Sequence, residues 1–188
     1  MTWDTIQIIF WTITYLLAII YAIKYKHHII PWAAMFLNMS WETAALLKYR
    51  SILHIPWFLL DMALVILFLF SHHERRSNRF RLIWIFCTVL TIAVFLKLFG
   101  YNNYMLWTSF LMDLFMATLF LGMHFKKPQI INLLCLFIGL TRVCGDYAAW
   151  RYYRSDNLVW VVGGAVQAVN LLYLILISMH ILKERRGR

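Results

Sequence analysis

The chain has 188 residues, of which 63% are hydrophobic, 18% aromatic and 14% charged. A soluble domain has roughly 45–50% apolar residues, so this composition excludes an ordinary soluble protein. The formal net charge of +10 at first suggests nucleic acid, but the charges fall between apolar runs and at the C-terminus, where anionic headgroups attract them. We therefore expect membrane lipids, and no nucleic acid, as partners.

Apolar runs along the chain predict seven transmembrane helices, each close to the ~20 residues that a bilayer requires. In chain order they cover about 5–24, 30–49, 53–72, 81–99, 103–123, 130–150 and 157–181. No Gly/Ser linker separates them, so residues 1–188 are expected to form a single all-α, polytopic integral membrane domain. The three cysteines fall inside apolar runs without metal-ligand spacing, and we expect neither a metal nor a cofactor.

Lys and Arg residues indicate the orientation of these helices. The loops after the first, third and fifth spans and the C-terminal tail carry twelve of the 18, against five on the other side. Because cytoplasmic loops are rich in Lys and Arg, the N-terminus is predicted outside (or lumenal) and the C-terminus in the cytoplasm. Such a multi-pass protein belongs to the plasma or inner membrane of a bacterium, which the abundance of Ile and Lys favours, or to the endoplasmic reticulum of a fungus.

Two segments of the chain resemble each other. Residues 42–51 align with residues 146–155, with five of ten positions identical and an acidic residue opening each segment. In the helices that follow, Asp61 aligns with Asn170. An internal repeat is the interpretation we favour, and chance similarity between two biased sequences is the alternative.

This repeat predicts a 3+1+3 arrangement of the seven helices. Two parallel three-helix repeats cover about 5–72 and 103–182, and a linker helix at about 81–99 inverts the chain between them. Parallel repeats place shared sites at the interface between the halves.

Four acidic residues lie inside the predicted spans, where a charged side chain is costly and marks a functional site. They are Glu42, Asp61, Asp113 and Asp146. A rise of about 1.5 Å per residue places all four in the outer half of the bilayer, where they could line one cavity. Glu42 is the strongest candidate, because residues 29–47 hold no other charge and no partner lies nearby in the sequence.

Aromatic side chains accompany two of these acids. Trp41 adjoins Glu42, and Trp57 precedes Asp61 by four residues, on the same helix face. Aromatic rings beside a carboxyl group exclude water from it, and their faces stabilise a nearby cation. A protonated acid in a dry cavity lined by aromatic rings is what carbocation chemistry requires.

The other polar residues also have structural interpretations. Asp146 and Arg142 are four residues apart on one helix and can neutralise each other as an ion pair. Asp61 and Asp113 can each satisfy polar groups of a neighbouring helix. The seven histidines lie mostly at helix ends, and we assign none of them a role.

A set of residues in the first two spans resembles the small seven-helix membrane terpene cyclases of fungal meroterpenoid and indole-diterpene pathways, of the paxilline and pyripyropene type. The likeness is specific over residues 11–42 and diffuse afterwards. The residues that carry it are Trp11, Tyr15, Lys24 and Asn38-Met39-Ser40-Trp41-Glu42, followed by Trp107 with Asp113 and by Arg151-Tyr152-Tyr153.

The resemblance implies a metal-independent, class II-like terpene cyclase, an isomerase or lyase of terpenoid biosynthesis that acts on a lipophilic polyprenyl or prenylated substrate. In that family a Glu in helix 2 and an Asp in helix 7 protonate an epoxide or alkene. Glu42 matches the first acid. Asn170 falls at or near the second, so Asp61, Asp113 or Asp146 is expected to supply it.

The candidate site residues fall into a catalytic group and a substrate-binding group. Glu42 is expected to donate the proton, while Asp61 or Asp146 tunes it or takes the final proton. The amide of Asn38, one turn before Glu42, is expected to orient that carboxyl group. The predicted substrate-binding residues are Asn38, Trp41, Trp57, Trp107, Asp113 and Asn170.

A transporter is the alternative function. Three helices plus one plus three, with parallel repeats, is also the layout of the sugar-transporting SWEET proteins, and acids in both halves suit proton coupling. Against a transporter, the three prolines lie at helix starts rather than within spans, where broken helices need them. A cyclase is expected to hold a blind pocket, whereas a transporter needs a path past Glu42 to the cytoplasm. The buried acids disfavour a purely structural subunit.

Overall fold

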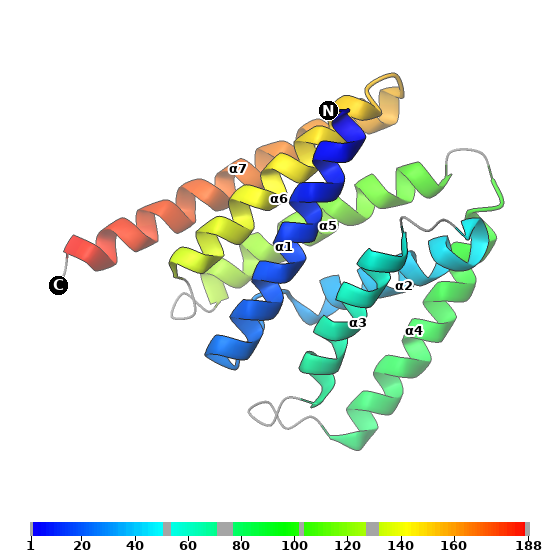
Figure 1. The fold of residues 1–188 in the computed structure, drawn as a ribbon, viewed down its shortest axis with the longest axis horizontal. Helices are drawn as coiled ribbons and strands as arrows, with labels where there is room; N and C mark the ends of the chain where they lie inside the picture. The colour runs from blue at the N-terminus through cyan, green and yellow to red at the C-terminus, as the bar shows by residue number, and fades with distance from the viewer. Residues whose placement is uncertain (1, 51–53, 71–76, 102–103, 127–131, 187–188) are drawn as a thin grey trace. The chain divides into compact units, whose positions relative to one another are not determined.

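The computed structural model describes residues 2–50, 54–70, 77–101, 104–126 and 132–186. These residues form seven helices and no strand (Figure 1). The helices are α1 Trp3–Tyr25, α2 Trp32–Tyr49, α3 His54–Phe70, α4 Asn78–Leu98, α5 Tyr104–Lys126, α6 Leu133–Tyr152 and α7 Asn157–Arg186.

Some sequence predictions fall outside the described residues. They concern the span ends at 53, 71–72, 103 and 130, the aligned residue Ser51, and the charged residues Arg75, Arg76, Lys127 and Arg188.

Five helices are long and apolar enough to cross a membrane, namely α1, α4, α5, α6 and α7. Helix α3 is apolar but has 17 residues, and α2 has 18 residues that include buried Asn38, Ser40 and Glu42. The prediction of an all-helical protein with several membrane-length helices is therefore confirmed. The seven-span topology and the 3+1+3 arrangement stay predictions.

Side-chain caps define where three of the helices begin. Oδ1 of Asn132 accepts hydrogen bonds from the backbone N–H groups of Leu134 and Cys135, at 2.9 and 3.3 Å, at the start of α6. Ser77 caps α4 and Asp156 caps α7 in the same way. Each cap satisfies N–H groups that have no partner within the helix.

The chain forms two compact units. The central unit comprises Ile19–Met112, and in it α2 packs against both α3 and α4. The flanking unit comprises Met1–Ala18 and Asp113–Arg188, and in it α6 packs against α7, which runs antiparallel to it (Figure 1). Helices α1 and α5 contribute residues to both units.

Helices α6 and α7 approach each other closely at Gly163. A Cβ atom at that position would overlap the indole ring of Trp150. The ring is held in place by stacking on Trp160, with centroids 4.5 Å apart, and its Nε1 donates to the Trp160 carbonyl oxygen at 3.0 Å. At Gly164, by contrast, an added Cβ meets Trp150 only at an ordinary van der Waals distance.

Gly163→Ala is expected to destabilise the protein by about 1–3 kcal/mol, because an added methyl group displaces the Trp150 ring from its stacked position. Gly164→Ala is the matched control on the neighbouring residue, and it is expected to be neutral or to stabilise by up to about 1 kcal/mol. Thermal unfolding of both variants in detergent measures the difference. Identical unfolding temperatures would contradict the close contact at Gly163.

Candidate functional site

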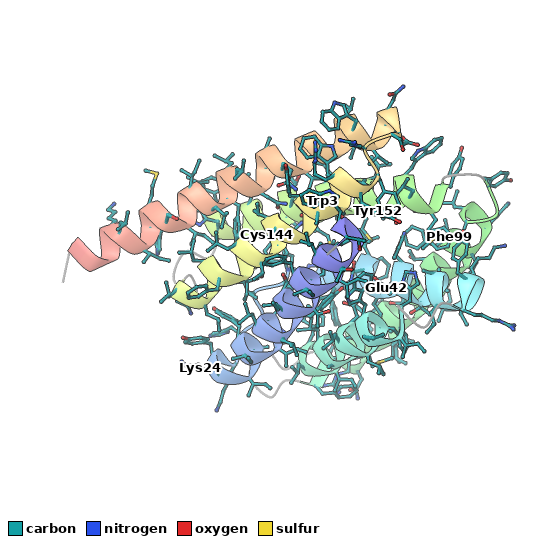
Figure 2. The ribbon with its side chains drawn as sticks, turned by 45° about the horizontal axis from the view of Figure 1, so that its top comes forward. Trp3, Lys24, Glu42, Phe99, Cys144 and Tyr152 are labelled. Carbon is teal, nitrogen blue, oxygen red and sulfur yellow. The ribbon has the colours of Figure 1, made fainter. Side chains whose placement is uncertain are left out.

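Glu42 is buried in the central unit and is hydrogen-bonded to a histidine. Its Oε2 lies 3.0 Å from Nδ1 of His54, the first residue of α3. The Glu42 side chain, labelled on α2 in Figure 2, is almost fully shielded from solvent. The reversal of the chain between α2 and α3 brings together two residues that are twelve positions apart. Glu42, for which no partner lies nearby in the sequence, thus has an imidazole as its hydrogen-bond partner.

Aromatic rings surround this pair. The His54 ring lies edge-on to the indoles of Trp41 and Trp57, with centroids 5.9 and 6.1 Å away. Trp41 also packs edge-on against Phe99, at 5.8 Å, and its Nε1 donates to Oγ1 of Thr108 at 3.2 Å. The hydrogen bond and the ring contacts fix the Trp41 indole beside the imidazole that bonds to Glu42. The rings exclude water from the pair and offer faces that attract cations.

Asn38 and Asp61 form a second polar contact between α2 and α3. Nδ2 of Asn38 donates to Oδ2 of Asp61 at 2.7 Å, and both side chains are buried. Asn38 was expected to orient Glu42, one turn away on the same helix. The structure shows its amide hydrogen-bonded to Asp61 across the helix pair, and it shows His54 hydrogen-bonded to Glu42. The orienting role of Asn38 stays a prediction.

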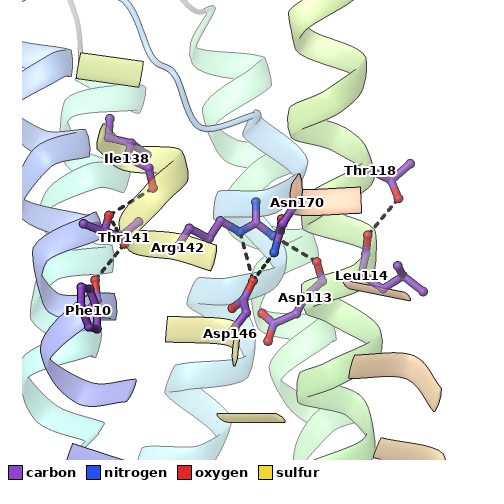
Figure 3. Close-up of polar contacts among 10 residues, drawn as sticks. Phe10, Asp113, Leu114, Thr118, Ile138, Thr141, Arg142, Asp146 and Asn170 are labelled. Carbon is purple, nitrogen blue, oxygen red and sulfur yellow. Dashed lines mark hydrogen bonds and ion pairs between the residues drawn. The ribbon is translucent and has the colours of Figure 1, made fainter. Parts of the chain in front are cut away.

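A separate polar cluster lies in the flanking unit and centres on Asp146 (Figure 3). Nδ2 of Asn170 on α7 donates to Oδ2 of Asp146 at 2.6 Å, and Nε of Arg142 lies 3.6 Å from the same oxygen. Arg142 also donates from Nη2 to the backbone carbonyl of Asp113, at 3.1 Å, and packs on the ring of Phe120. The ion pair that the four-residue spacing of Arg142 and Asp146 indicates is present.

The two helix pairs carry matching hydrogen bonds with exchanged partners. In α2–α3 the amide stands on the first helix and the carboxyl group on the second. In α6–α7 the carboxyl group stands on the first helix and the amide on the second. Asp61 and Asn170 are aligned in the predicted repeat, whereas Asp146 aligns with Glu42 and not with Asn38. The two contacts therefore share their chemistry, one amide donor and one carboxyl acceptor, but only one of their two aligned positions.

Asn38→Asp is expected to destabilise the protein by about 1–3 kcal/mol, because it replaces an amide donor with a second carboxyl group at a buried contact. Adding Asp61→Asn to this variant is expected to restore stability, since the exchanged pair is the one found between α6 and α7. Unfolding of the wild type, both single variants and the double variant gives the coupling energy. Additive effects of the two substitutions would contradict a specific contact.

The other predicted residues are also placed by the structure. Trp107 is half-buried on α5, with its ring 5.3 Å from that of Tyr104. Asp113 is half-buried and offers its backbone carbonyl to Arg142. Nε2 of buried Gln167 has no hydrogen-bond partner among the described residues. Within the same part of the chain, no group of three or more His, Cys, Asp or Glu side chains could hold a metal ion.

His54 is the residue that sequence reasoning missed. Its one signal is position: it opens the helix that follows Glu42 in the chain, and Trp57 lies one turn further along. A histidine at a helix end is ordinarily read as solvated, so this position alone did not distinguish it.

Comparison with known proteins gives no match to this chain among family models, curated proteins or solved structures. Function is therefore argued from the residues and their contacts.

Proposed function

We propose that this protein is a membrane-embedded terpene cyclase that starts a metal-independent, class II-like cyclisation by proton transfer from Glu42. The observation that carries the proposal is the buried Glu42 carboxyl group, hydrogen-bonded to His54 in a setting of indole rings. A positioned acid contributes roughly 10²–10⁴ to the rate of a proton-transfer step. Adjacent aromatic faces stabilise the cation that this step creates.

A lipophilic polyprenyl or prenylated substrate suits a site of this kind. Such a molecule is soluble in the bilayer and carries a terminal alkene or epoxide that a carboxylic acid can protonate. The resulting cation is consumed by ring formation, and a final proton loss gives a neutral product. Asp61, held by Asn38 on the same helix pair as Glu42, is the residue we favour for tuning the acid or taking this last proton. Asp146, which is paired with Arg142, is the alternative.

We further propose that α2 and α3 also cross the membrane. Eighteen residues of α2 span about 27 Å, close to the hydrocarbon thickness of a bilayer. Its polar residues Asn38, Ser40 and Glu42 are buried, and α3 and α4 pack against it. The distribution of Lys and Arg supports an outside N-terminus and a cytoplasmic C-terminus.

A small-molecule transporter of the SWEET type is the second candidate. The observation in its favour is that each predicted repeat holds one buried hydrogen bond between an amide and a carboxyl group, Asn38–Asp61 in the first and Asn170–Asp146 in the second. Parallel repeats are a feature of transporters of this type.

Product analysis in D₂O tests the proposal. The purified protein is incubated with linear polyprenyl alcohols, polyprenyl epoxides and prenylated aromatic compounds, with and without EDTA. We expect cyclised product in both conditions, and for alkene substrates one deuterium bound to carbon at the protonated position. Formation that stops in EDTA would contradict metal independence. A folded, monodisperse sample that yields no product, but carries sugars into liposomes, would favour the transporter.

A further inference from the structure

We propose that His54 is a positioning residue that returns a proton to Glu42 after each turnover. The two side chains then act as a relay from the start of α3 to the buried acid. This inference rests on the proposed cyclase function. His54 does not protonate the substrate, because that proton comes from Glu42. The inference instead assigns His54 the task of restoring the Glu42 proton before the next turnover.

The position of His54 suits a relay. Its Nδ1 faces Oε2 of Glu42 at 3.0 Å, which is direct hydrogen-bond distance. The His54 side chain is 14% exposed, against 7% for Glu42, so the imidazole lies on the more accessible side of the pair. Arg50 at the end of α2 and Ile55 in the first turn of α3 are exposed. One imidazole ring therefore connects the buried acid to the exposed region where α2 ends and α3 begins.

The surroundings of His54 suit a transient positive charge. The indoles of Trp41 and Trp57 contact the imidazole at interplanar angles of 62° and 70°. Indole rings stabilise a nearby cation, by about 0.5–2 kcal/mol depending on how far it is removed from water. An imidazole also has two ring nitrogens, so it can accept a proton at Nε2 while it donates another from Nδ1.

The proton transfers balance over one catalytic cycle. The O–H bond of Glu42 breaks as its proton bonds to the substrate, and the cation left after ring closure later loses one proton to water. Neutral His54, which carries its proton at Nδ1, takes up a proton from hydronium at Nε2, and the imidazolium so formed passes its Nδ1 proton to the Glu42 carboxylate. The imidazole is then protonated at Nε2 and returns to the Nδ1–H form by proton exchange with water. Substrate and product differ by no atoms, and no reactant beyond water is needed.

His54→Gln separates a relay from a purely structural contact. The glutamine side chain can still donate a hydrogen bond to Glu42, but it cannot carry a proton between solvent and the acid. With enzyme in excess over substrate, each Glu42 reacts at most once and need not be reprotonated. We therefore expect the single-turnover rate of His54→Gln to stay close to that of the wild type. With substrate in excess, Glu42 must be reprotonated each time, and we expect at least about a tenfold loss of rate.

Two further measurements accompany this experiment. Imidazole added to the buffer is expected to restore part of the steady-state rate of His54→Ala, because a free imidazole can occupy the vacated space. His124→Gln is the matched control, since His124 lies in the flanking unit and its ring contacts His180, 6.0 Å away. This control is expected to keep wild-type rates in both regimes.

Each outcome is decisive for the relay. Equal losses in single turnover and in steady state would overturn it and leave His54 as a structural partner of Glu42. An unchanged steady-state rate in His54→Gln would overturn it as well. If the wild type itself forms no cyclised product, the proposed function fails and the relay with it. If the wild type forms cyclised product and His54→Gln has the same rates as the wild type, the relay is wrong but the proposed cyclase function stands.

Discussion

Glu42→Gln is expected to lower the rate of cyclised product formation by about 10²–10⁴, the contribution of a positioned general acid. Glutamine keeps the shape of the side chain and a hydrogen-bonding group for His54, but it has no acidic proton. Initial rates measured by gas chromatography and mass spectrometry quantify the loss.

Thr118→Val serves as the control for this substitution. The Thr118 hydroxyl bonds to the Leu114 carbonyl of its own helix, at 2.9 Å, and its loss is expected to leave the rate unchanged. Both variants must elute as the wild type does on size exclusion. If Glu42→Gln retains wild-type turnover, the proton comes from another acid, and Asp61→Asn identifies whether it is the one held by Asn38.

Arg142→Met is expected to have the largest effect on stability, a loss of about 3–5 kcal/mol. The substitution removes the guanidinium that lies 3.6 Å from Oδ2 of Asp146 and leaves a buried acidic group without its counter-charge. Asp146→Asn in the same chain is expected to recover most of the loss, because the buried pair then carries no charge and Asn170 keeps an amide partner. The stabilities of Arg142→Met, Asp146→Asn, the double variant and the wild type are compared by unfolding in denaturing detergent. Together they form a double-mutant cycle, which gives the coupling energy between the two side chains.

Equal stability of Arg142→Met and the wild type would contradict this expectation. It would mean that the contacts of Asp146 with Asn170 suffice to hold the carboxyl group. A double variant as unstable as Arg142→Met would place the energy in the hydrogen bond to the Asp113 carbonyl or in the packing on Phe120.

Contacts within one helix could be predicted from the sequence, whereas contacts between helices could not. Arg142 and Asp146 are four residues apart, and on a helix this spacing alone makes them neighbours. The partner of Glu42 depends instead on how α2 and α3 are rotated about their axes. Nothing local in the sequence sets that rotation, so the sequence did not single out His54 as a partner of Glu42.

Helix positions were predicted well because long apolar runs leave few alternatives. The predicted span 157–181 lies within α7, which continues to Arg186. The extension follows from the residues beyond the apolar run, since Leu, Lys, Glu and Arg are all good helix formers. The end of an apolar run indicates where the chain leaves the hydrocarbon core, but the backbone hydrogen bonds of a helix can continue beyond that point.

The polar residues of α2 and α3 have a consequence for biogenesis. An Asp at the centre of an isolated helix raises the free energy of insertion through the translocon by about 2.5–3.5 kcal/mol. Asp61 lies on α3, which is apolar but shorter than a lone span, and its donor Asn38 lies on α2, which is long enough but not apolar enough. Pairing them before contact with lipid removes much of that penalty. With α2 and α3 as the membrane spans proposed above, the nascent chain is best integrated as a preformed hairpin, with this hydrogen bond made before the two helices leave the translocon.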